Sequence, residues 1–475
     1  MPETPSPSLV WFRQDLRLAD NPALIAAAGR ASPIVALYVL DDEAPGMWAL
    51  GGASRWWLHH SLESLGGSLK KLGIPLVLRR GPAQTVIPDF VKEIGADAVY
   101  WNRCYEPFAV ARDTVIKTGL NQSDVKAESF GAALIAEPWM VKTQSGTPFR
   151  VFTPFWRALE KDRRPAKPQK APTHHHASIP IAGDDLADWR LLPAKPNWAT
   201  GFDEDWTPGE AGAQKQLALF IADALRGYPT TRNLPGVEGV SRLSPYLHWG
   251  EISIRQVWHA IELHAGPGAD AYLRELGWRD FAHHLIWQFP DLPETPFHAE
   301  FSTFPWRKDA KALKAWQRGQ TGYPFVDAGM RQLWATGWMH NRVRMVVASF
   351  LIKHLLLAWQ EGEAWFWDCL VDADLAANAM NWQWVAGSGA DAAPYFRIFN
   401  PVLQGEKFDT NGAYVRRWVP EIAALPDKWL HKPWEAPAEI LAKAKVELGE
   451  TYPHPIVDHD TARRRALEAL KTMRE

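Results

Sequence analysis

The sequence predicts two domains: an α/β N-terminal domain built on a doubly wound parallel sheet, and a large all-α C-terminal domain. In residues 1–130, short apolar runs alternate with helical segments. This alternation is absent from residues 131–208, and residues 209–475 are predicted to be helical almost throughout. At 475 residues the chain is longer than one hydrophobic core usually organises, which also favours more than one domain.

The N-terminal 130 residues are predicted to hold five buried strands, at 8–12, 33–40, 76–79, 98–101 and 125–130. Helices are predicted between them at 21–30, 53–72, 83–95 and 108–119. This alternation is typical of a parallel sheet with helices on both faces. No GxGxxG motif follows the first strand, so the sequence does not indicate a dinucleotide site of the Rossmann type here.

Residues 131–208 are predicted to be an interdomain linker. Its stretch KDRRPAKPQKAPTHHHASIP is basic, rich in proline and aperiodic, which is typical of a chain running over the surface. His174–His176 could form a metal site. Because no Cys or Asp stands at ligand spacing, we expect a solvated loop instead.

The C-terminal part shows helical periodicity at 211–225, 252–264, 269–288, 308–318, 326–336, 341–360 and 374–385. No apolar run reaches the ~18 residues that a membrane helix needs. The N-terminus lacks the features of a signal peptide, and the two cysteines fit a reducing compartment, so we expect a cytoplasmic protein. The net charge of −2 means that any nucleic-acid binding must come from a local basic patch.

The stretch DADLAANAMNWQW places Asp374, Asn378 and Trp382 at i, i+4 and i+8, along one helix face. Alanines surround these side chains, which suits the close approach of a flat ligand. The alternative is a solvated helix face. The 26 tryptophans exceed what packing alone usually needs, so we expect some of them to stack on a ligand or carry electrons.

Three further groups of polar residues accompany this face. Arg344 is a natural partner for Asp374, either beside a ligand or as a structural ion pair. GVSRLSPYLHWGEIS sets hydroxyls and backbone amides before Pro245, which suits a pyrophosphate, although an ordinary capped turn explains it too. Glu275, Trp278 and Arg279 share a face that suits a planar ligand; a Glu275–Arg279 pair on a solvated face is the alternative.

Five motifs of the C-terminal part carry a resemblance: GVSRLSPYLHWGEIS, ELGWRDF, MHNRVRM, DADLAANAMNWQW and APYFRIFNPVLQGEKFD. Together with the opening WFRQDLRLADNPAL, they resemble the photolyase/cryptochrome family over essentially the whole chain. Within that family the chain resembles bacterial cyclobutane pyrimidine dimer photolyases, and LHWGEIS leans toward the class III branch.

The resemblance implies that FAD binds in the helical domain. Its cofactor contacts would be Tyr228, Ser241, Arg242, Leu243, Ser244, Tyr272, Arg279, Arg344, Asp372 and Asp374, with Asn378 facing the flavin N5. Val240 stands where many relatives have threonine, so one hydroxyl contact is in doubt.

The resemblance also implies a substrate, UV-damaged DNA that contains pyrimidine dimers. The dimer pocket would be formed by Glu275, Trp278, Asn341, Met345 and Trp384, and Arg232, Arg342, Gln404 and Lys407 would contact DNA. Of these, Glu275, Asn341 and Met345 would be catalytic, together with Asn378. Photolyases are among the enzymes that flip their target bases. We expect a monomer that needs no metal.

The implied mechanism is driven by light. Excited, reduced FAD donates one electron to the dimer, the cyclobutane ring opens, and the electron returns. Trp382, Trp359 and Trp306 match the chain that carries electrons to oxidised flavin, although core packing alone explains a tryptophan. The family's antenna chromophore is commonly methenyltetrahydrofolate; here the alternatives are folate in another pose, a different chromophore, or none. The family's Asn–Glu pair for the folate is Phe108–Ala109 here, with Glu106 as a remaining contact.

Two other functions compete with dimer repair. The first is a cryptochrome, a blue-light photoreceptor that uses the same FAD without repair. Glu275, Met345 and Trp384 favour repair, as does the short basic segment that follows Pro455 in place of a long tail. The second is repair of 6-4 lesions, whose enzymes carry histidines where this chain has Asn341 and Met345.

Overall fold

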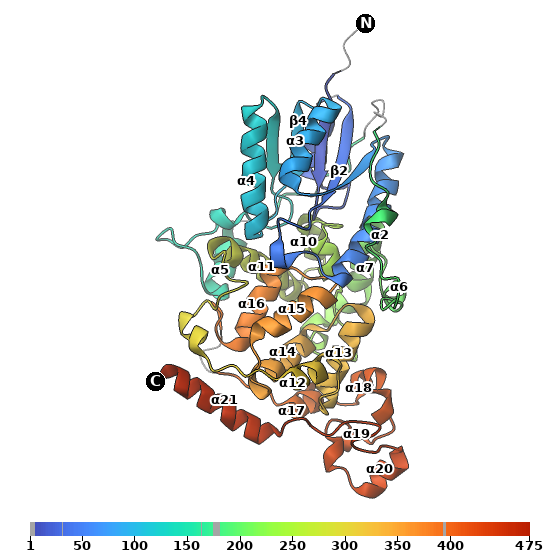
Figure 1. The fold of residues 1–475 in the computed structure, drawn as a ribbon, viewed down its shortest axis with the longest axis vertical. Helices are drawn as coiled ribbons and strands as arrows, with labels where there is room; N and C mark the ends of the chain where they lie inside the picture. Colours follow the sequence, from blue (N-terminus) through green and yellow to red (C-terminus); the bar gives the residue numbers. More distant parts are fainter. Residues whose placement is uncertain (1–4, 31, 163, 174–180, 393–395) are drawn as a thin grey trace.

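The computed structural model describes residues 5–30, 32–162, 164–173, 181–392 and 396–475. His174–His176 lie outside the described residues. Figure 1 shows the sheet and its helices at one end of the molecule and the helical domain at the other. The predicted fold class, an α/β domain followed by an all-α domain, is therefore confirmed.

All five predicted strands are present. They are β1 (Ser8–Phe12), β2 (Ile34–Leu40), β3 (Leu76–Arg80), β4 (Ala98–Asn102) and β5 (Lys126–Phe130). They form one parallel sheet in the order β3-β2-β1-β4-β5. Every residue of β1, β2 and β4 is buried, as expected for a sheet covered on both faces. The covering helices are α1 (Pro22–Ala28), α2 (Gly52–Lys71), α3 (Ala83–Ile94) and α4 (Pro107–Gln122).

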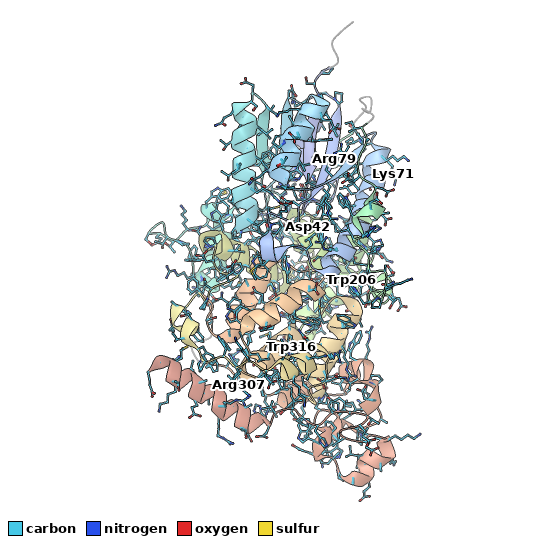
Figure 2. The ribbon with its side chains drawn as sticks, in the orientation of Figure 1. Asp42, Lys71, Arg79, Trp206, Arg307 and Trp316 are labelled. Carbon is cyan, nitrogen blue, oxygen red and sulfur yellow. The ribbon has the colours of Figure 1, made fainter. Side chains whose placement is uncertain are left out.

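The segment between the domains is attached along much of its described length. Helix α5 (Phe152–Asp162) packs against the helical domain, and α6 (Phe202–Asp205) follows later. The backbone N–H of Asp184 donates to the Leu78 carbonyl at 2.9 Å, which lays the segment along the edge of β3. The Trp206 indole, labelled in Figure 2, donates to the Thr336 carbonyl at 2.7 Å. These contacts hold the connecting chain on both domains.

The helical domain contains α7 (Glu210–Leu219), α8 (Tyr228–Thr231), α9 (Ser244–His248), α10 (Ile254–Glu262), α11 (Pro267–Gln288), α12 (Ala310–Gln317), α13 (Pro324–Thr336), α14 (Asn341–Ser349), α15 (Trp359–Cys369), α16 (Leu375–Ala386), α17 (Pro401–Phe408), α18 (Ala413–Trp418), α19 (Asp427–Leu430), α20 (Ala438–Ala444) and α21 (His459–Arg474). Side chains cap several of them and satisfy their first N–H groups: Ser253, Asp309, Asp374, Asn400 and Asp458. Among the described residues, no helix is long and apolar enough to cross a membrane.

The prediction of one helix over residues 341–360 is wrong. Helix α14 ends at Ser349, a π-helical turn covers Phe350–His354, and α15 begins at Trp359. Leu356 between them has a φ of 54°, which no α-helix accommodates. The backbone there pairs with another strand-like segment instead, because the Arg307 N–H donates to the Leu356 carbonyl at 2.7 Å. Tertiary pairing has overridden the helical periodicity of this leucine-rich run.

Two stretches that are far apart in the sequence, the opening WFRQDLRL and the later LHWGEIS, meet at the domain junction. The Leu16 N–H donates to the Trp249 carbonyl at 3.0 Å, and the buried Arg17 guanidinium donates to the Gly250 carbonyl at 2.8 Å. A Cβ added at Gly250 would lie 2.1 Å from the Gln14 carbonyl oxygen, so only glycine fits there. These residues therefore join the domains.

Glu251 extends this junction to α2. Its fully buried carboxyl accepts hydrogen bonds from the Trp57 indole at 3.2 Å, the Gly209 N–H at 2.6 Å and the Ser61 hydroxyl. Burial raises the pKa of the Glu251 carboxyl to about 8, although the three donors pull it down. The neutral acid is therefore favoured at the junction.

We expect the stability that Glu251 contributes to depend on pH. A raised pKa in the folded state means that the contribution is full below the ordinary value of 4.5 and is lost as the pH rises toward about 8. Glu251→Gln, which cannot ionise, should cost about 1 kcal/mol at pH 6 through a weakened hydrogen bond. Urea unfolding should then show a flatter loss of stability between pH 6 and pH 9 than in the parent. Parallel pH profiles for the two proteins would refute the raised pKa.

Candidate functional site

The N-terminus of α16 is built around the Asp374 carboxylate. Asp374 caps the helix by accepting the Ala377 N–H at 2.8 Å. One of its oxygens lies 3.4 Å from Nε2 of His283 on α11 and 3.8 Å from Nδ1 of His248 on α9. Burial alone would raise the pKa of Asp374, but His283, His248 and Arg279 hold it well below its ordinary value. An ionised carboxylate therefore lies where α9, α11 and α16 meet.

The prediction that Arg344 pairs with Asp374 is wrong. The Arg344 guanidinium binds Asp372, at 2.8 and 3.0 Å to its two oxygens, and also donates to the Met339 carbonyl at 2.7 Å. The Asp372 side chain is only 3% exposed, so the pair is largely withdrawn from water. Asp374 is not available to Arg344 because it caps α16 and faces the histidines.

Asn378 and Trp382 lie one helical turn apart on α16, and both are buried. The Asn378 amide nitrogen donates to the Glu363 carbonyl of α15 at 3.1 Å, which leaves the amide oxygen free to accept another hydrogen bond. The Trp382 ring lies 5.0 Å from Phe366 and 6.3 Å from Trp316, in both cases edge to face. A Cβ added at Gly362 would lie 2.1 Å from the Trp382 ring, so this glycine lets α15 and α16 approach closely.

The Glu363 side chain beside Asn378 was not predicted as a site residue. It is 1% exposed, its Oε1 has no partner within the described structure, and burial raises its pKa well above the ordinary value. Burial therefore favours the protonated form of the Glu363 side chain. The backbone carbonyl of the same residue is the one that accepts from Asn378. The sequence gives a weak signal for it, since Glu363 stands among apolar residues in GEAWFW.

The turn before α9 brings together the residues expected to contact a cofactor's phosphates. The Tyr272 hydroxyl donates to the Ser241 hydroxyl at 3.0 Å, and the Tyr228 ring lies 5.4 Å from that of Tyr272. Leu243 is fully buried, whereas Ser244 is exposed at the start of α9.

Arg242 in the same turn has a φ of 51°. Its guanidinium lies over the rings of Trp206, at 4.3 Å, and Trp338, at 5.3 Å, and is 3.5 Å from the Asp205 carboxylate. A small polar cavity lined by Arg242, His340 and other residues lies beside this guanidinium. Two aromatic rings and one carboxylate therefore hold the Arg242 guanidinium in place.

On α11, Glu275 forms an ion pair with Arg232 at 2.6 Å. The alternative of a solvated Glu275–Arg279 pair is wrong, because Arg279 donates instead to the Ala133 carbonyl at 2.5 Å and the Leu247 carbonyl at 3.3 Å. Burial raises the pKa of Glu275 above its ordinary value, although Arg232 opposes this. Glu275 thus points toward the basic residues that follow α8.

Trp278 has one face covered. Its ring stacks on Phe152 of α5 with a centroid distance of 3.6 Å and an angle of 11° between planes. The side chain is still half-buried, so only its opposite face or its edge is left for another ring. The other residues expected in the dimer pocket differ in exposure: Asn341 is exposed, and Met345 and Trp384 are half-buried.

Arg232 after α8, Arg342 of α14 and Lys407 of α17 form a basic surface. Arg342 and Lys407 both lie over the Phe408 ring, at 4.5 and 5.2 Å, and Arg342 donates to the Asn233 side chain at 2.7 Å. Burial, then Arg232 and Arg397, lower the pKa of Arg342, which shows that positive charges crowd together here. Gln404 on α17 is half-buried, and its Oε1 has no partner within the described structure.

The other two tryptophans of the expected electron chain lie in the same region. Trp359, at the start of α15, is buried in the core that also contains Trp382. Trp306 is half-buried at the edge of that core, next to Arg307, which pairs with Leu356. Trp316, fully buried inside the helical domain (Figure 2), contacts Trp382 and was not predicted as part of this group.

Glu106, expected as an antenna contact, immediately precedes α4 and is buried. Its carboxylate accepts from the Gln14 side chain at 2.7 Å and from the Tyr105 N–H at 3.1 Å. It follows the carboxyl end of β4, where the strand order of the sheet reverses beside β1. Ligands of open α/β sheets bind at such positions.

The reassigned ion pair can be tested by double-mutant cycles. For Arg344→Gln combined with Asp372→Asn, we expect a coupling energy of about 2 kcal/mol, because the two side chains are in contact and withdrawn from water. For Arg344→Gln combined with Asp374→Asn, the coupling should be within about 0.5 kcal/mol of zero. The free energy of urea unfolding gives both values. A larger coupling to Asp374 would restore the pairing expected from the sequence.

Comparisons with known proteins agree over nearly the full chain. Residues 8–173 match the DNA photolyase family model, and residues 272–472 match the FAD binding domain of DNA photolyase. A deoxyribodipyrimidine photo-lyase of Agrobacterium fabrum is 52% identical over 99% of this chain and 98% of its own, and Cryptochrome-1 of Arabidopsis thaliana is 41% identical over 98% and 70%.

The structure of a bacterial class III photolyase from Agrobacterium tumefaciens superposes with a TM-score of 0.96 at 52% identity, covering 99% of this chain and 98% of that one. The helical domain described here is thus an FAD-binding domain, and its buried carboxylates, arginine and amide fit a polar planar cofactor. On the evidence of sequence and fold together, this chain belongs to the photolyase/cryptochrome family.

Proposed function

We propose that this protein is a deoxyribodipyrimidine photo-lyase, which uses light to split cyclobutane pyrimidine dimers in UV-damaged DNA. The observation that carries the proposal is Glu275, a half-buried carboxyl on α11 that forms an ion pair with Arg232 beside the basic surface. The 52% identity to a protein of that name, over 99% of the chain, supports it.

FAD, when bound and reduced, supplies the electron that opens the dimer. We propose that Asp372, Arg344 and Asp374 hold its polar groups, and that the free oxygen of Asn378 accepts a hydrogen bond from the flavin. The turn with Ser241, Ser244 and Tyr272, and the flanking Tyr228, Arg242, Leu243 and Arg279, would form the rest of the binding site. The position of Asn378, fixed from behind by the Glu363 carbonyl, supports an accepting role for its oxygen.

Glu275 would act on the lesion. A fixed polar group aimed at the charge that develops on a pyrimidine carbonyl lowers the barrier. Asn341, Met345, Trp384 and the free side of Trp278 would complete the pocket. When DNA binds, Arg232 can exchange Glu275 for a phosphate, so the ion pair seen here would be the DNA-free arrangement.

The basic surface would hold the DNA backbone. Arg232 follows α8, Arg342 is on α14, and Lys407 and Gln404 are on α17; Arg342 is close to both Arg232 and Lys407. Arginine and lysine contacts to phosphates fix the position of the duplex without reading its sequence. Such contacts also explain how a chain with a net charge of −2 could bind DNA.

A cryptochrome is the second candidate, because Cryptochrome-1 of Arabidopsis thaliana is 41% identical. We further propose methenyltetrahydrofolate as the antenna chromophore, bound near Glu106 at the carboxyl end of β4. To bind the pterin, Glu106 would have to give up its hydrogen bond with Gln14.

We also propose that the protein is a cytoplasmic monomer. Its two free cysteines fit a reducing compartment.

The test of the proposed function is illumination of DNA that contains cyclobutane dimers, with the flavin of the protein reduced chemically. Restored pyrimidines are counted by chromatography, with a sample kept in the dark as the control. Repair only in the light supports a photo-lyase. A protein that binds FAD and responds to blue light, but restores no pyrimidines, would be a cryptochrome.

Glu275 and Lys407 should separate repair from binding. Glu275→Gln should lower repair per bound lesion at least about tenfold, because it weakens the polar group aimed at the lesion. Lys407→Ala should instead weaken DNA binding and reduce the salt slope by about 0.9, the value for one phosphate contact. The measurements are repair yield at saturating protein and Kd against salt. Unchanged repair per bound lesion in Glu275→Gln would contradict the assigned role.

Trp382 is predicted to be the first electron donor to oxidised FAD. It lies one turn, about 6 Å of helix rise, beyond Asn378. Trp382→Phe keeps an aromatic ring in the pocket between Phe366 and Trp316 but removes the easily oxidised indole. The variant should bind FAD, repair dimers when reduced chemically, and fail to photoreduce. Trp316→Phe is the matched control, and photoreduction at the parent rate in Trp382→Phe would reassign the path.

A further inference from the structure

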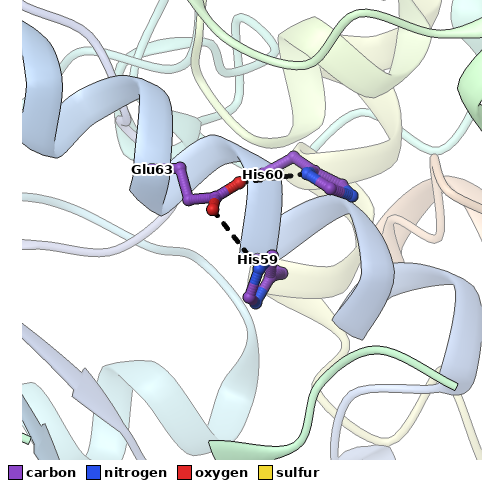
Figure 3. Close-up of side chains that lie close together, drawn as sticks. All are labelled: His59, His60 and Glu63. Carbon is purple, nitrogen blue, oxygen red and sulfur yellow. Dashed lines mark hydrogen bonds and ion pairs between the residues drawn. The ribbon is translucent and has the colours of Figure 1, made fainter. Parts of the chain in front are cut away.

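Three potential metal ligands lie together on α2, away from the FAD and DNA residues. Figure 3 shows the Glu63 carboxylate between the rings of His59 and His60. Nε2 of His59 is 3.6 Å from one oxygen of Glu63, and Nδ1 of His60 is 3.2 Å from the other. One ligand atom from each residue lies within 4.8 Å of the others, and this is the one such group among the residues that the structure describes.

The two imidazoles are held in place by their surroundings. The His59 side chain is 13% exposed, and its Nδ1 is buried without a partner in the described structure, so Nε2 is the nitrogen turned to the carboxylate. The His60 ring packs edge to face against Trp56 at 4.7 Å and against His59 at 5.2 Å.

We propose that His59, His60 and Glu63 bind a divalent transition metal of the Zn²⁺ class. Ligands placed tetrahedrally at about 2.0–2.2 Å from Zn²⁺ lie about 3.4 Å from one another. The His59 and His60 nitrogens lie 3.6 and 3.2 Å from the two different oxygens of Glu63, and the three ligand atoms lie within 4.8 Å of one another, so the side chains would close slightly around the ion. Three protein ligands would leave one position for water.

A metal bound by this group would stabilise the folded protein, because the group lies on the helix that contacts the domain junction. Trp57 and Ser61, on the same two turns of α2, donate to Glu251 at the domain junction. A metal that binds the folded helix but not the unfolded chain stabilises the folded state by mass action. Zn²⁺ bound here would therefore raise the melting temperature of the whole protein.

A simple ion pair on a helix surface is the competing explanation, and α10 supplies the matched control. There His259 and Glu262 lie 3.5 Å apart but belong to no group of three ligands in the described part of the chain. If pairing with a carboxylate were enough to bind Zn²⁺, His259→Gln would reduce binding as much as a change on α2. A three-ligand site predicts that it changes nothing.

The test is calorimetric titration of the full-length, untagged protein with Zn²⁺. All proteins carry serines in place of His174–His176, because that run of histidines could bind metal itself. We expect one equivalent of Zn²⁺ per chain and a higher melting temperature in its presence. Glu63→Gln should weaken binding at least about tenfold, and the double change His59→Gln, His60→Gln should remove it. Co²⁺ in place of Zn²⁺ should give visible absorption bands that report its geometry.

The Glu63 variant decides the proposal even if the double variant unfolds, because the Glu63 side chain is 56% exposed and its replacement leaves the core intact. Zn²⁺ binding as tight in Glu63→Gln as in its background would overturn the proposal. So would the absence of stoichiometric binding in the background protein, or an equal loss in His259→Gln. None of these measurements depends on FAD or on repair activity.

Discussion

The helical domain depends on one buried charge, the carboxylate of Asp374. Taking such a group out of water costs several kcal/mol unless it is fully compensated. Three compensations meet here: the Ala377 N–H at the positive end of α16, His283 of α11 and His248 of α9. Each comes from a different helix, so none of the three can shift without exposing the charge to an unfavourable environment.

That constraint fixes the geometry of the proposed chemistry. Glu275 and Trp278, the residues proposed to meet the lesion, are on α11, and Asn378 and Trp382, proposed to meet the flavin, are on α16. Because α11 and α16 are joined through Asp374, the spacing between these two sets of residues is set by the packing of two helices. Electron transfer falls steeply with distance, so a rigid spacing is what a light-driven repair reaction requires.

The sequence could predict the sheet because its central strands β1, β2 and β4 are buried on both faces and read as largely apolar runs between turn residues. It could also predict that Asn378 and Trp382 share one side of a helix, since that follows from helical spacing alone. It could not predict the break between α14 and α15. Residues 346–357 are nearly all apolar, and the pairing of Arg307 with Leu356 that ends the helix involves residues far apart in the sequence.

The partner of Arg344 was beyond prediction for a related reason. Asp372 and Asp374 are two residues apart, and either carboxylate could reach a guanidinium. What decides between them is which one caps α16, and capping is visible only when the backbone of the helix start is known. Similarly, the stacking of Phe152 on Trp278 joins residues of two different segments, so periodicity gave no sign that one face of that indole is occupied.

The motifs that resemble the photolyase/cryptochrome family contain residues with two different physical roles, which their contacts distinguish. Some residues of WFRQDLRL and LHWGEIS bond to each other or to the rest of the protein: Arg17 binds the Gly250 carbonyl, and Glu251 accepts three donors. In contrast, the Asn378 amide oxygen and the exposed Ser244 and Asn341 keep hydrogen-bonding capacity unused by the fold. Arg17 and Glu251 use their side chains to join the two domains, whereas the Asn378 oxygen, without a partner in the described structure, is left for the proposed ligand. A motif match alone assigns both kinds to the same family, and only the accounting of hydrogen bonds tells them apart.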